Sequence, residues 1–366
     1  MIARSKKLPH CRADKRVVLI NSYRMKEAKR LIQDQLYPAQ HLWGLWNLSD
    51  NWRASVTDIC LNYMGEKNRF LASIVGQVER LLGDPVQVVW ALTGRNRGSL
   101  VYAANPKTGT LVGLLKRLGF VRVPYVVLVH SYPISGWAKW CLESADALLV
   151  FSNRIKQLME LDGVTPAAIT VVGWGPDLSW AQYELELDNV QADFIAAGKT
   201  NRDYASLRKL AGSGRLNGHI LDGDVAATYR HGQSTECAGR PSYPDVMALM
   251  ASSRVVIIPL LNPSMLSGLT EFSDALALGR PVVMTRNDWM PLDIESLGIG
   301  VWLDSHDVDS VHAAVRKAAE IPKERVLEIA RWFNMQTFSE TLEEVLDSVW
   351  HRTHKTDENT SENQNA

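Results

Sequence analysis

The sequence of 366 residues has little that would build a disulfide scaffold, a metal cluster or a membrane span. Its four cysteines are widely separated and none belongs to a C-x-x-C pair, which excludes a disulfide-rich fold and a zinc cluster. No apolar run approaches the length of a transmembrane helix, and the first 16 residues are polar and basic without the apolar core of a signal peptide. We therefore expect a cytoplasmic protein that at most attaches to the inner face of a membrane.

Charge of one sign is not in excess either. The chain has 40 basic and 40 acidic residues, so no overall field attracts nucleic acid, and we expect no nucleic-acid partner. The sequence also lacks G-x-x-x-x-G-K-[ST], G-x-G-x-x-G after its first apolar strand, and G-x-S-x-G. Kinase-like, dinucleotide-binding and esterase functions are therefore without support. The pair in Asp222-Gly223-Asp224 can bridge a divalent cation, but such pairs are common in turns, and we expect neither a metal nor a cofactor.

What the sequence does contain is two consecutive series of apolar strands that alternate with helices, separated by an irregular stretch at 174–191. This order predicts two doubly wound α/β domains that face each other. The predicted strands are 16–22, 86–92, 99–104, 125–131, 145–152 and 169–173, then 193–197, 216–221, 255–260, 281–285 and 300–303. The predicted helices are 24–36, 66–82, 111–118 and 154–161, then 204–210, 243–252, 270–278, 308–320 and a broken helix over 323–350. The tail at 353–366 has no hydrophobic residues to bury and is expected to be disordered.

The clearest unit lies between the strands 255–260 and 281–285. Apolar residues recur at helical spacing between them, and a glycine followed two residues later by a proline ends the helix. Ser267 and Gly268 stand at the helix entrance, where the first N–H groups lack intrahelical partners and a glycine lets an anion approach. Two interpretations stay open: a phosphate binds there, or Glu271 in the first turn satisfies the same N–H groups.

A phosphate at this helix would also need a cation, because a helix end alone contributes only about 0.3–1 kcal/mol. Lys199 and Arg202 follow the first strand of the second domain, and parallel strands bring such turns to the same edge of the sheet as Gly268. Asp274 lies about one and a half turns into the helix, where a carboxylate can accept the hydroxyls of a ribose. Taken singly, each of these charged residues is more often a solvated surface group.

In the first domain, the strand 125–131 places His130 at its carboxyl end, where open α/β sheets bind their ligands. A histidine there can donate a hydrogen bond or titrate near neutrality. The alternative is a satisfied histidine at the end of a strand, and the residues alone do not separate the two.

Two further segments have apolar side chains for which two interpretations are open: contact with a ligand or membrane, and packing within the protein. The segment 111–122 is apolar on one side and basic on the other, which fits a peripheral membrane contact or a packed surface helix. Trp43 and Trp46 fit stacking on a sugar or a lipid, or a cover for the edge of the sheet. For both segments the packing interpretation is the stronger one.

These patterns together resemble GT-B glycosyltransferases, and in particular glycosyltransferase family 4. The segment 193–210, with Ala-Gly-Lys-Thr-Asn-Arg-Asp-Tyr at 197–204, resembles the opening of their donor domain. The segment 243–283, with its Ser-Gly pair and the run Asp-Ala-Leu-Ala-Leu-Gly-Arg-Pro-Val from Asp274, is similar to their nucleotide-sugar motif. The helices over 323–350 look like the segment that crosses back onto the first domain in this fold.

The resemblance implies a domain organisation: an acceptor-binding domain at 1–180, a nucleotide-sugar-binding domain at 191–330, and a helix at 331–350 that packs back on the first domain. It also implies retaining transfer of a sugar from a nucleotide diphosphate to the hydroxyl of a glycan, a glycolipid or a small molecule, without a required metal. In this reaction His130 would orient the sugar or stabilise the positive charge that develops on it. The implied donor-binding residues are Gly198, Lys199, Arg202, Ser267, Gly268, Leu269, Thr270, Glu271 and Asp274.

One departure from the family concerns the acids of the donor site. The family usually has two glutamates eight positions apart, and here Leu266 and Asp274 stand in those places. The first acid, which contacts the sugar, is therefore missing, and Glu271 is a candidate substitute. Two other functions stay open: a catalytically silent partner subunit of the same fold, and a nucleotide-sugar 2-epimerase, for which we find no matching carboxylate cluster. The sequence leaves the base, the sugar, the acceptor and the oligomeric state open.

Overall fold

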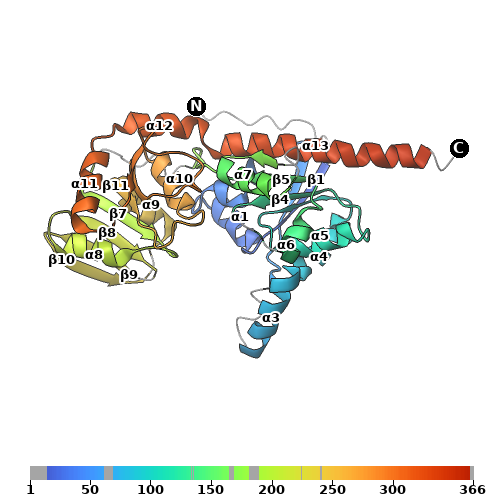
Figure 1. Ribbon diagram of the computed structural model, residues 1–366, viewed down its shortest axis with the longest axis horizontal. Coiled ribbons are helices and arrows are strands. Elements are labelled where there is room, and N and C mark those ends of the chain that lie inside the picture. Colours follow the sequence, from blue (N-terminus) through green and yellow to red (C-terminus); the bar gives the residue numbers. More distant parts are fainter. Residues whose placement is uncertain are drawn as a thin grey trace.

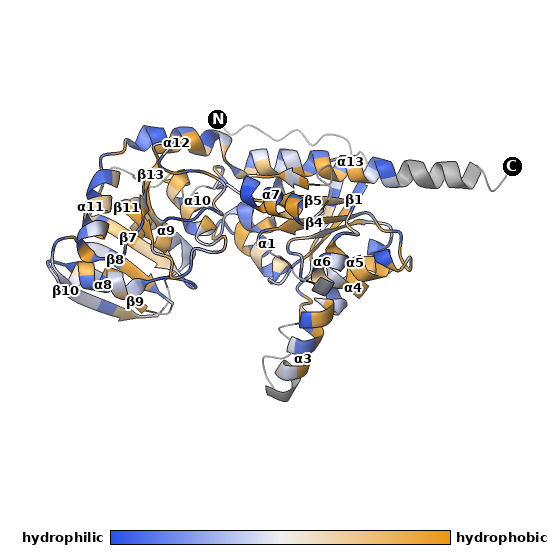
Figure 2. Cartoon of the chain, viewed as in Figure 1, coloured by the Kyte–Doolittle hydropathy of each residue, from blue (hydrophilic) through white to orange (hydrophobic). Residues whose placement is uncertain are grey.

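The chain forms two α/β domains that long C-terminal helices bridge, as the computed structural model shows (Figure 1). The structure describes residues 15–61, 69–132, 134, 136–164, 169–180, 189–223, 225–239 and 241–362, with side chains outside the description at 69–71 and from 354 onward. Apolar residues gather in the strands and on the helix faces turned toward them (Figure 2).

The first domain is built on a parallel sheet of six strands. They are β1 (Lys15–Ile20), β2 (Trp52–Ser55), β3 (Leu100–Ala103), β4 (Tyr125–Val129), β5 (Ala147–Val150) and β6 (Ile169–Val171), in the spatial order β2-β1-β3-β4-β5-β6. Around it lie α1 (Met25–Gln33), α3 (Arg69–Leu82), α4 (Pro85–Leu92), α5 (Thr110–Arg117), α6 (Gly136–Leu142), α7 (Asn153–Leu161) and the 3-10 turns η1 (Ala39–Leu42), η2 (Leu45–Asn47) and η3 (Gly94–Asn96). The runs of valine and leucine in β3, β4 and β5 are buried throughout, because helices cover both faces of a parallel sheet.

The second domain repeats this plan with seven strands. They are β7 (Ala192–Gly198), β8 (Gly218–Asp222), β9 (Val225–Arg230), β10 (Gln233–Ala238), β11 (Ser253–Ile258), β12 (Val282–Thr285) and β13 (Gly300–Leu303), in the order β10-β9-β8-β7-β11-β12-β13. The strand β9 pairs antiparallel with both β8 and β10, and the other pairs are parallel. The helices are α8 (Tyr204–Gly212), α9 (Tyr243–Ala251), α10 (Leu269–Ala277) and α11 (Val308–Ala318).

The last two helices connect the domains. The helix α12 (Lys323–Trp332) packs into the core of the second domain, whereas α13 (Met335–Glu362) lays Phe338, Leu342 and Leu346 into the core of the first. The predicted break in 323–350 therefore falls where the chain crosses between the domains. A Cβ on Gly175, in the other crossing, would lie 2.2 Å from the carbonyl oxygen of Phe333, so the two crossings touch through their backbones.

Three sequence predictions are corrected by the structure. The segment 86–92, predicted as a strand, lies within α4, because Asp84 caps the helix by accepting from the Gln87 amide (3.0 Å) and a proline occupies its first position. The hairpin of β9 and β10 and the strand β2 were not predicted. Residues 353–362, predicted to be disordered, continue α13, since a helix already formed extends by one hydrogen bond per residue without burying side chains.

Candidate functional site

The carboxyl ends of strands in both sheets open on one cavity of about 870 Å³ between the domains. Its second-domain wall is formed by the turn after β7 and by the entrance to α10. Its first-domain wall is formed by the segments that follow β1, β4, β5 and β6, together with η1. Nine of the ten predicted site residues line this cavity: His130, Gly198, Lys199, Ser267, Gly268, Leu269, Thr270, Glu271 and Asp274. The tenth, Arg202, lies behind the wall and reaches it through side-chain contacts.

The entrance of α10 requires a glycine. Gly268 has a φ of +84°, and a Cβ there would lie 2.6 Å from Cγ2 of Ile258 and 3.2 Å from Cε of Met284. The first N–H groups of α10, at Leu269 and Thr270, belong to the turn that lines the cavity. Because these groups lack intrahelical acceptors, this end of the helix favours an anion.

Arg202 is held under the helix entrance by Glu271. Its Nη2 lies 2.8 Å from Oε1 of Glu271, while its Nη1 donates to Oγ of Ser267 (3.2 Å) and to the carbonyl oxygen of Thr200 (2.8 Å). The Arg202 side chain is 4% exposed and that of Glu271 is 15% exposed. Glu271 therefore pairs with a guanidinium rather than capping α10, and the charge of Arg202 is offset before any ligand arrives.

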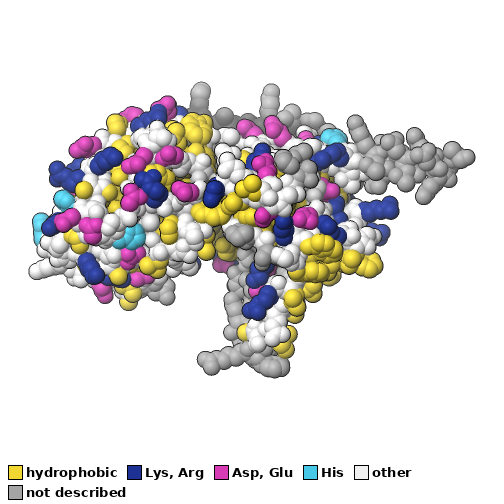
Figure 3. Space-filling model, in the orientation of Figure 1, with side chains coloured by type: hydrophobic (Ala, Val, Ile, Leu, Met, Phe, Trp, Pro, Cys, Tyr) yellow, Lys and Arg dark blue, Asp and Glu magenta, His cyan; other side chains and the backbone are white. Residues whose placement is uncertain are grey.

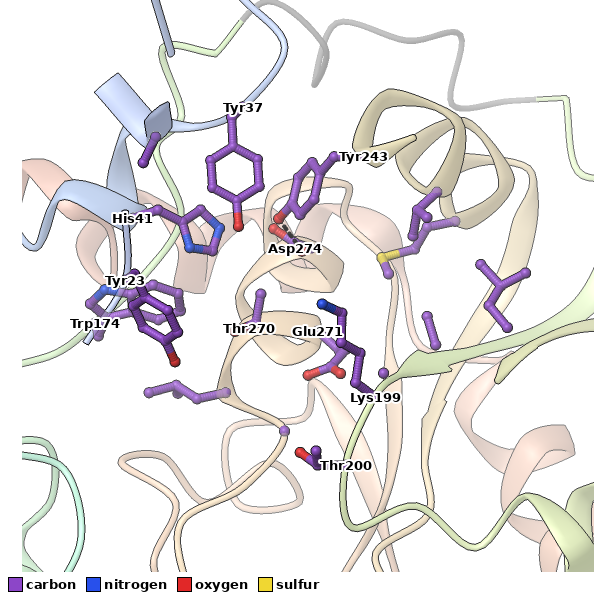
Figure 4. A pocket seen from close by; sticks show the side chains of 18 of the residues that line it. Tyr23, Tyr37, His41, Trp174, Lys199, Thr200, Tyr243, Thr270, Glu271 and Asp274 are labelled. Atoms are coloured by element: carbon purple, nitrogen blue, oxygen red, sulfur yellow. Dashed lines mark hydrogen bonds between the residues drawn. The ribbon is translucent and has the colours of Figure 1, made fainter. Parts of the chain in front are cut away.

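Lys199 differs from Arg202 in this respect. It is exposed at the cavity wall and forms no ion pair within the part of the chain that the structure describes. Figure 4 shows its side chain among those that line the cavity, rising from the turn after β7. Lys199 is thus the cation of this wall that an anion can reach.

Asp274 is engaged from both domains. Its Oδ2 accepts from the Tyr243 hydroxyl at 2.6 Å, and its Oδ1 accepts from the side-chain amide of Gln40, in η1, at 3.2 Å. The Gln40 side chain is itself fixed, because its carbonyl oxygen accepts from the Asp177 amide at 2.6 Å. Asp274 is 2% exposed, so a ribose could reach this carboxylate only by replacing protein hydrogen bonds.

His130 is half-buried at the end of β4 and stacks on Trp43, with 6.5 Å between the ring centroids. Burial lowers the pKa of His130, which keeps the imidazole neutral at physiological pH. The ring of Trp43 also lies 6.2 Å from Phe151 and 5.8 Å from Trp174, so it belongs to the cavity wall. Trp46, the other tryptophan of this segment, is 41% exposed.

The sequence analysis missed an aromatic group around Asp274. His41 stacks on Tyr37 at 4.1 Å and meets Tyr243 edge-on at 5.9 Å, as Figure 4 shows. Burial lowers the pKa of His41 to about 3, and its Nε2 is buried with no hydrogen-bond partner among the described residues. The sequence signal was that aromatic residues and a glycine at 40–46 interrupt the helical pattern of the preceding segment. This interruption does not tell which residues of the second domain face the segment.

A second missed group holds the turn that carries Arg202. His306 Nδ1 lies 2.7 Å from Oδ2 of Asp203, and its Nε2 lies 2.8 Å from Oγ1 of Thr285. Burial opposes ionisation of Asp203, but hydrogen bonds from Ser206 and His306 leave its pKa below the usual value. These contacts tie the turn after β7 to the ends of β12 and β13.

Of the carboxylate pair at 222–224, one member lies within the described residues. Asp222 forms an ion pair with Arg208 (2.8 Å), and Asp224 lies outside the described residues. Within the described ranges, no group of three or more potential ligands could hold a metal ion.

Solved structures of similar architecture align with nearly the whole chain. Sucrose-phosphate synthase from Thermosynechococcus elongatus has a TM-score of 0.60 at 14% identity, over 92% of this chain and 100% of its own. Trehalose 6-phosphate synthase from Burkholderia multivorans has a TM-score of 0.56 at 11% identity, over 94% and 98%. HepE from Anabaena, in complex with UDP, has a TM-score of 0.54 at 14% identity, over 91% and 100%.

No protein-family model matches the chain, and no curated protein matches it in sequence. The structural likeness shows that the chain has the GT-B fold, in which two Rossmann-like domains face each other across a cleft. The predicted fold class is confirmed.

Proposed function

We propose that this protein is a glycosyltransferase that moves a sugar from a nucleotide diphosphate to an acceptor hydroxyl with retention of configuration. The observation that carries the proposal is the entrance of α10, where a glycine-opened helix end and the unpaired Lys199 face one cavity with His130. The similarity to HepE, which binds UDP and also UDP with glucose in its crystal structures, supports it.

The diphosphate would bind between the N–H groups of Leu269 and Thr270 and the ammonium group of Lys199. Negative charge grows on the diphosphate as its bond to the sugar breaks, and preorganised donors stabilise such charge most effectively. Arg202 would contribute through the position of Ser267, because Glu271 already balances its charge. The proposal assigns no metal, since the helix end and a lysine supply the positive charge.

The nucleoside would bind at Asp274. Ribose hydroxyls can take the place of the Tyr243 hydroxyl and the Gln40 amide as donors to this carboxylate, and the rings of Tyr37 and His41 lie beside it. Because Gln40 belongs to the first domain, such an exchange would couple nucleotide binding to movement between the domains. Closure around the donor would then exclude water and suppress hydrolysis.

His130 would act on the sugar from the opposite wall. A neutral imidazole can hydrogen-bond a sugar hydroxyl without repelling the positive charge that develops at the anomeric carbon. The acceptor hydroxyl would enter from the first domain, on a glycan, a glycolipid or a small molecule. We also propose a cytoplasmic location, which the widely spaced cysteines support.

A catalytically silent subunit is the competing proposal, and two observations favour it: Leu266 replaces the first acid, and Asp274 is already saturated by protein donors. An epimerase still lacks a matching carboxylate cluster across the cavity. Thermal unfolding with UDP-, GDP- and ADP-sugars, followed by an assay for released nucleotide, separates these functions. A ligand at 100 times its dissociation constant adds about 2.7 kcal/mol of stability.

We expect one donor to raise the unfolding temperature and to release its nucleotide when an acceptor is present. His130→Ala should keep the thermal shift and lose turnover. A shift without turnover for any acceptor would favour the silent subunit, and unchanged turnover in His130→Ala would remove the catalytic role of this residue. The absence of a shift with every nucleotide sugar would overturn donor binding itself.

A further inference from the structure

The first domain exposes an unusual concentration of large apolar side chains. Of the 17 large hydrophobic residues exposed in the described part of the chain, seven lie between positions 74 and 140. Five of them form what we name the α3–α6 apolar surface: Leu81 (60% exposed), Leu118 (54%), Phe120 (73%), Trp137 (44%) and Trp140 (36%). Figure 3 shows hydrophobic side chains gathered over α5 and α6 and continuing along one edge of α3.

Direct contacts make this surface continuous. Trp137 Nε1 donates to the carbonyl oxygen of Leu81 at 2.7 Å, and the rings of Trp137 and Trp140 stack at 5.5 Å. The guanidinium of Arg117 lies 4.7 Å from the centre of the Trp140 ring, and Leu118 follows it in the chain. A single patch therefore runs from the end of α3 across α6 to the end of α5.

The charges around the patch are predominantly basic. Its acidic side chains are each paired with a cation: Glu79 with Lys107 (3.3 Å), Glu143 with Arg117 (3.5 Å), Asp146 with Lys116 (2.7 Å) and Asp162 with Lys139 (4.0 Å). Arg80 and Arg122 are exposed and have no ion-pair partner in the ranges that the structure describes. These two arginines stand next to Leu81 and close to Phe120, so the rim of the surface carries excess positive charge.

We propose that the α3–α6 apolar surface binds the surface of an anionic lipid bilayer. Leucine and phenylalanine can enter the boundary between headgroups and acyl chains, tryptophan rings favour this boundary, and arginines at the rim contact anionic headgroups. In the described residues no helix is both long and apolar enough to cross a bilayer, so the contact is peripheral.

An anionic bilayer matches both the exposed apolar side chains and the basic rim of this surface. A second copy of this chain would have to bring acidic groups to Arg80 and Arg122. The inference goes beyond the proposed transfer reaction, because lipid binding is measured without donor or acceptor. It would place the first domain, and with it the acceptor side of the cavity, next to the membrane. A glycolipid acceptor would then be the favoured class.

The test is sedimentation of the full chain with vesicles of phosphatidylglycerol and phosphatidylethanolamine, and with vesicles of phosphatidylcholine. The double variant Leu118→Ser/Trp137→Ser should reduce partitioning to the anionic vesicles by about tenfold or more, since two exposed apolar side chains lose their burial. Leu261→Ser/Trp332→Ser is the matched control, because it makes the same change at residues that are 67% and 48% exposed in the second domain. It should leave partitioning unchanged.

The charge contribution is tested separately. Arg80→Glu/Arg122→Glu should weaken binding to anionic vesicles by at least about fivefold for each arginine and change binding to phosphatidylcholine little. Circular dichroism checks that each variant is folded. Wild-type protein that does not sediment with anionic vesicles would overturn the proposal. Equal losses of vesicle binding in Leu118→Ser/Trp137→Ser and in its control Leu261→Ser/Trp332→Ser would also overturn it. So would a wild-type dimer, measured by light scattering, that Leu118→Ser/Trp137→Ser converts to a monomer without any effect on vesicles.

Discussion

The two walls of the cavity handle charge in opposite ways. The second-domain wall holds a buried ion pair, and in front of it a free lysine and a helix end that an anion can reach. The first-domain wall is aromatic, and burial keeps both of its histidines neutral. The comparison suggests that one domain binds the charged part of a ligand, while the other shapes the site and excludes water.

The two walls meet in polar contacts, among them those of Gln40 with Asp274 and of the Ser273 hydroxyl with the carbonyl oxygen of Trp174. A buried carboxylate needs hydrogen-bond donors, and that of Asp274 takes them from both domains. The second wall is therefore expected to control stability and binding, and the first wall to control turnover and pH dependence. Four predictions test this division, in order of decreasing effect.

The largest effect is expected from Arg202→Ala. Removing the guanidinium leaves Glu271 buried without its partner, which should lower the free energy of unfolding by about 3 kcal/mol. Arg202→Met/Glu271→Gln removes both charges and should recover most of this loss. Urea unfolding of the three proteins provides the measurement. If Arg202→Ala were as stable as the wild type, the ion pair of Arg202 and Glu271 would not stabilise this wall.

Gly268→Ala should cost about 2 kcal/mol, since the new side chain must adopt a left-handed conformation and press on Ile258. Gly212→Ala is the matched control, because a Cβ at that position would meet no atom within 4 Å. It should be neutral or slightly stabilising in the same unfolding experiment. Equal effects at the two glycines would contradict the importance of the helix entrance.

Lys199→Ala should leave the free energy of unfolding unchanged and weaken nucleotide-sugar binding by about tenfold, because it removes one charge-assisted contact of about 1.4 kcal/mol. Titration calorimetry with the donor found by thermal shift measures the loss. Lys209→Ala, at an exposed position of α8, should bind the donor as the wild type does. If both variants bind alike, the diphosphate does not reach Lys199.

At neutral pH, where the other variants are compared, the smallest effect is expected at the first wall, because its contribution appears only in acid. The unfolded chain protonates His41 near pH 6.5, whereas the folded chain keeps it neutral down to about pH 3. Stability is therefore lost as the pH falls below 6.5, by about 1.4 kcal/mol per pH unit at most, and is unaffected above it. His41→Phe should reduce the slope of the free energy of unfolding against pH, between pH 4 and 6.5, by the amount that the uptake of about one proton on unfolding contributes. His351→Phe, at an exposed position of α13, should not.

Most of the fold could be predicted because its signals are local. Apolar runs mark β4, β5, β7 and β11, with β-branched residues prominent in β4 and β11, and glycine with proline marks the end of α10. The segment 86–92 shows where this fails. Its Val88 and Ala91 are buried against the sheet, and a mostly apolar run of seven residues fits a buried strand as well as a buried helix.

Of the site, local sequence was enough to place the turn after β7 and the entrance of α10 at the cavity, because parallel sheets bring their loops to one edge and Gly268 marks a helix entrance with a positive φ. Which of the charged side chains at the site remain unpaired depends on tertiary packing. Arg202 and Glu271 are 69 residues apart, and Gln40 and Asp274 are 234 apart. Local spacing governs backbone conformation, but the partner of a buried charge depends on which distant segment packs against it. That information arises only when the two domains are assembled.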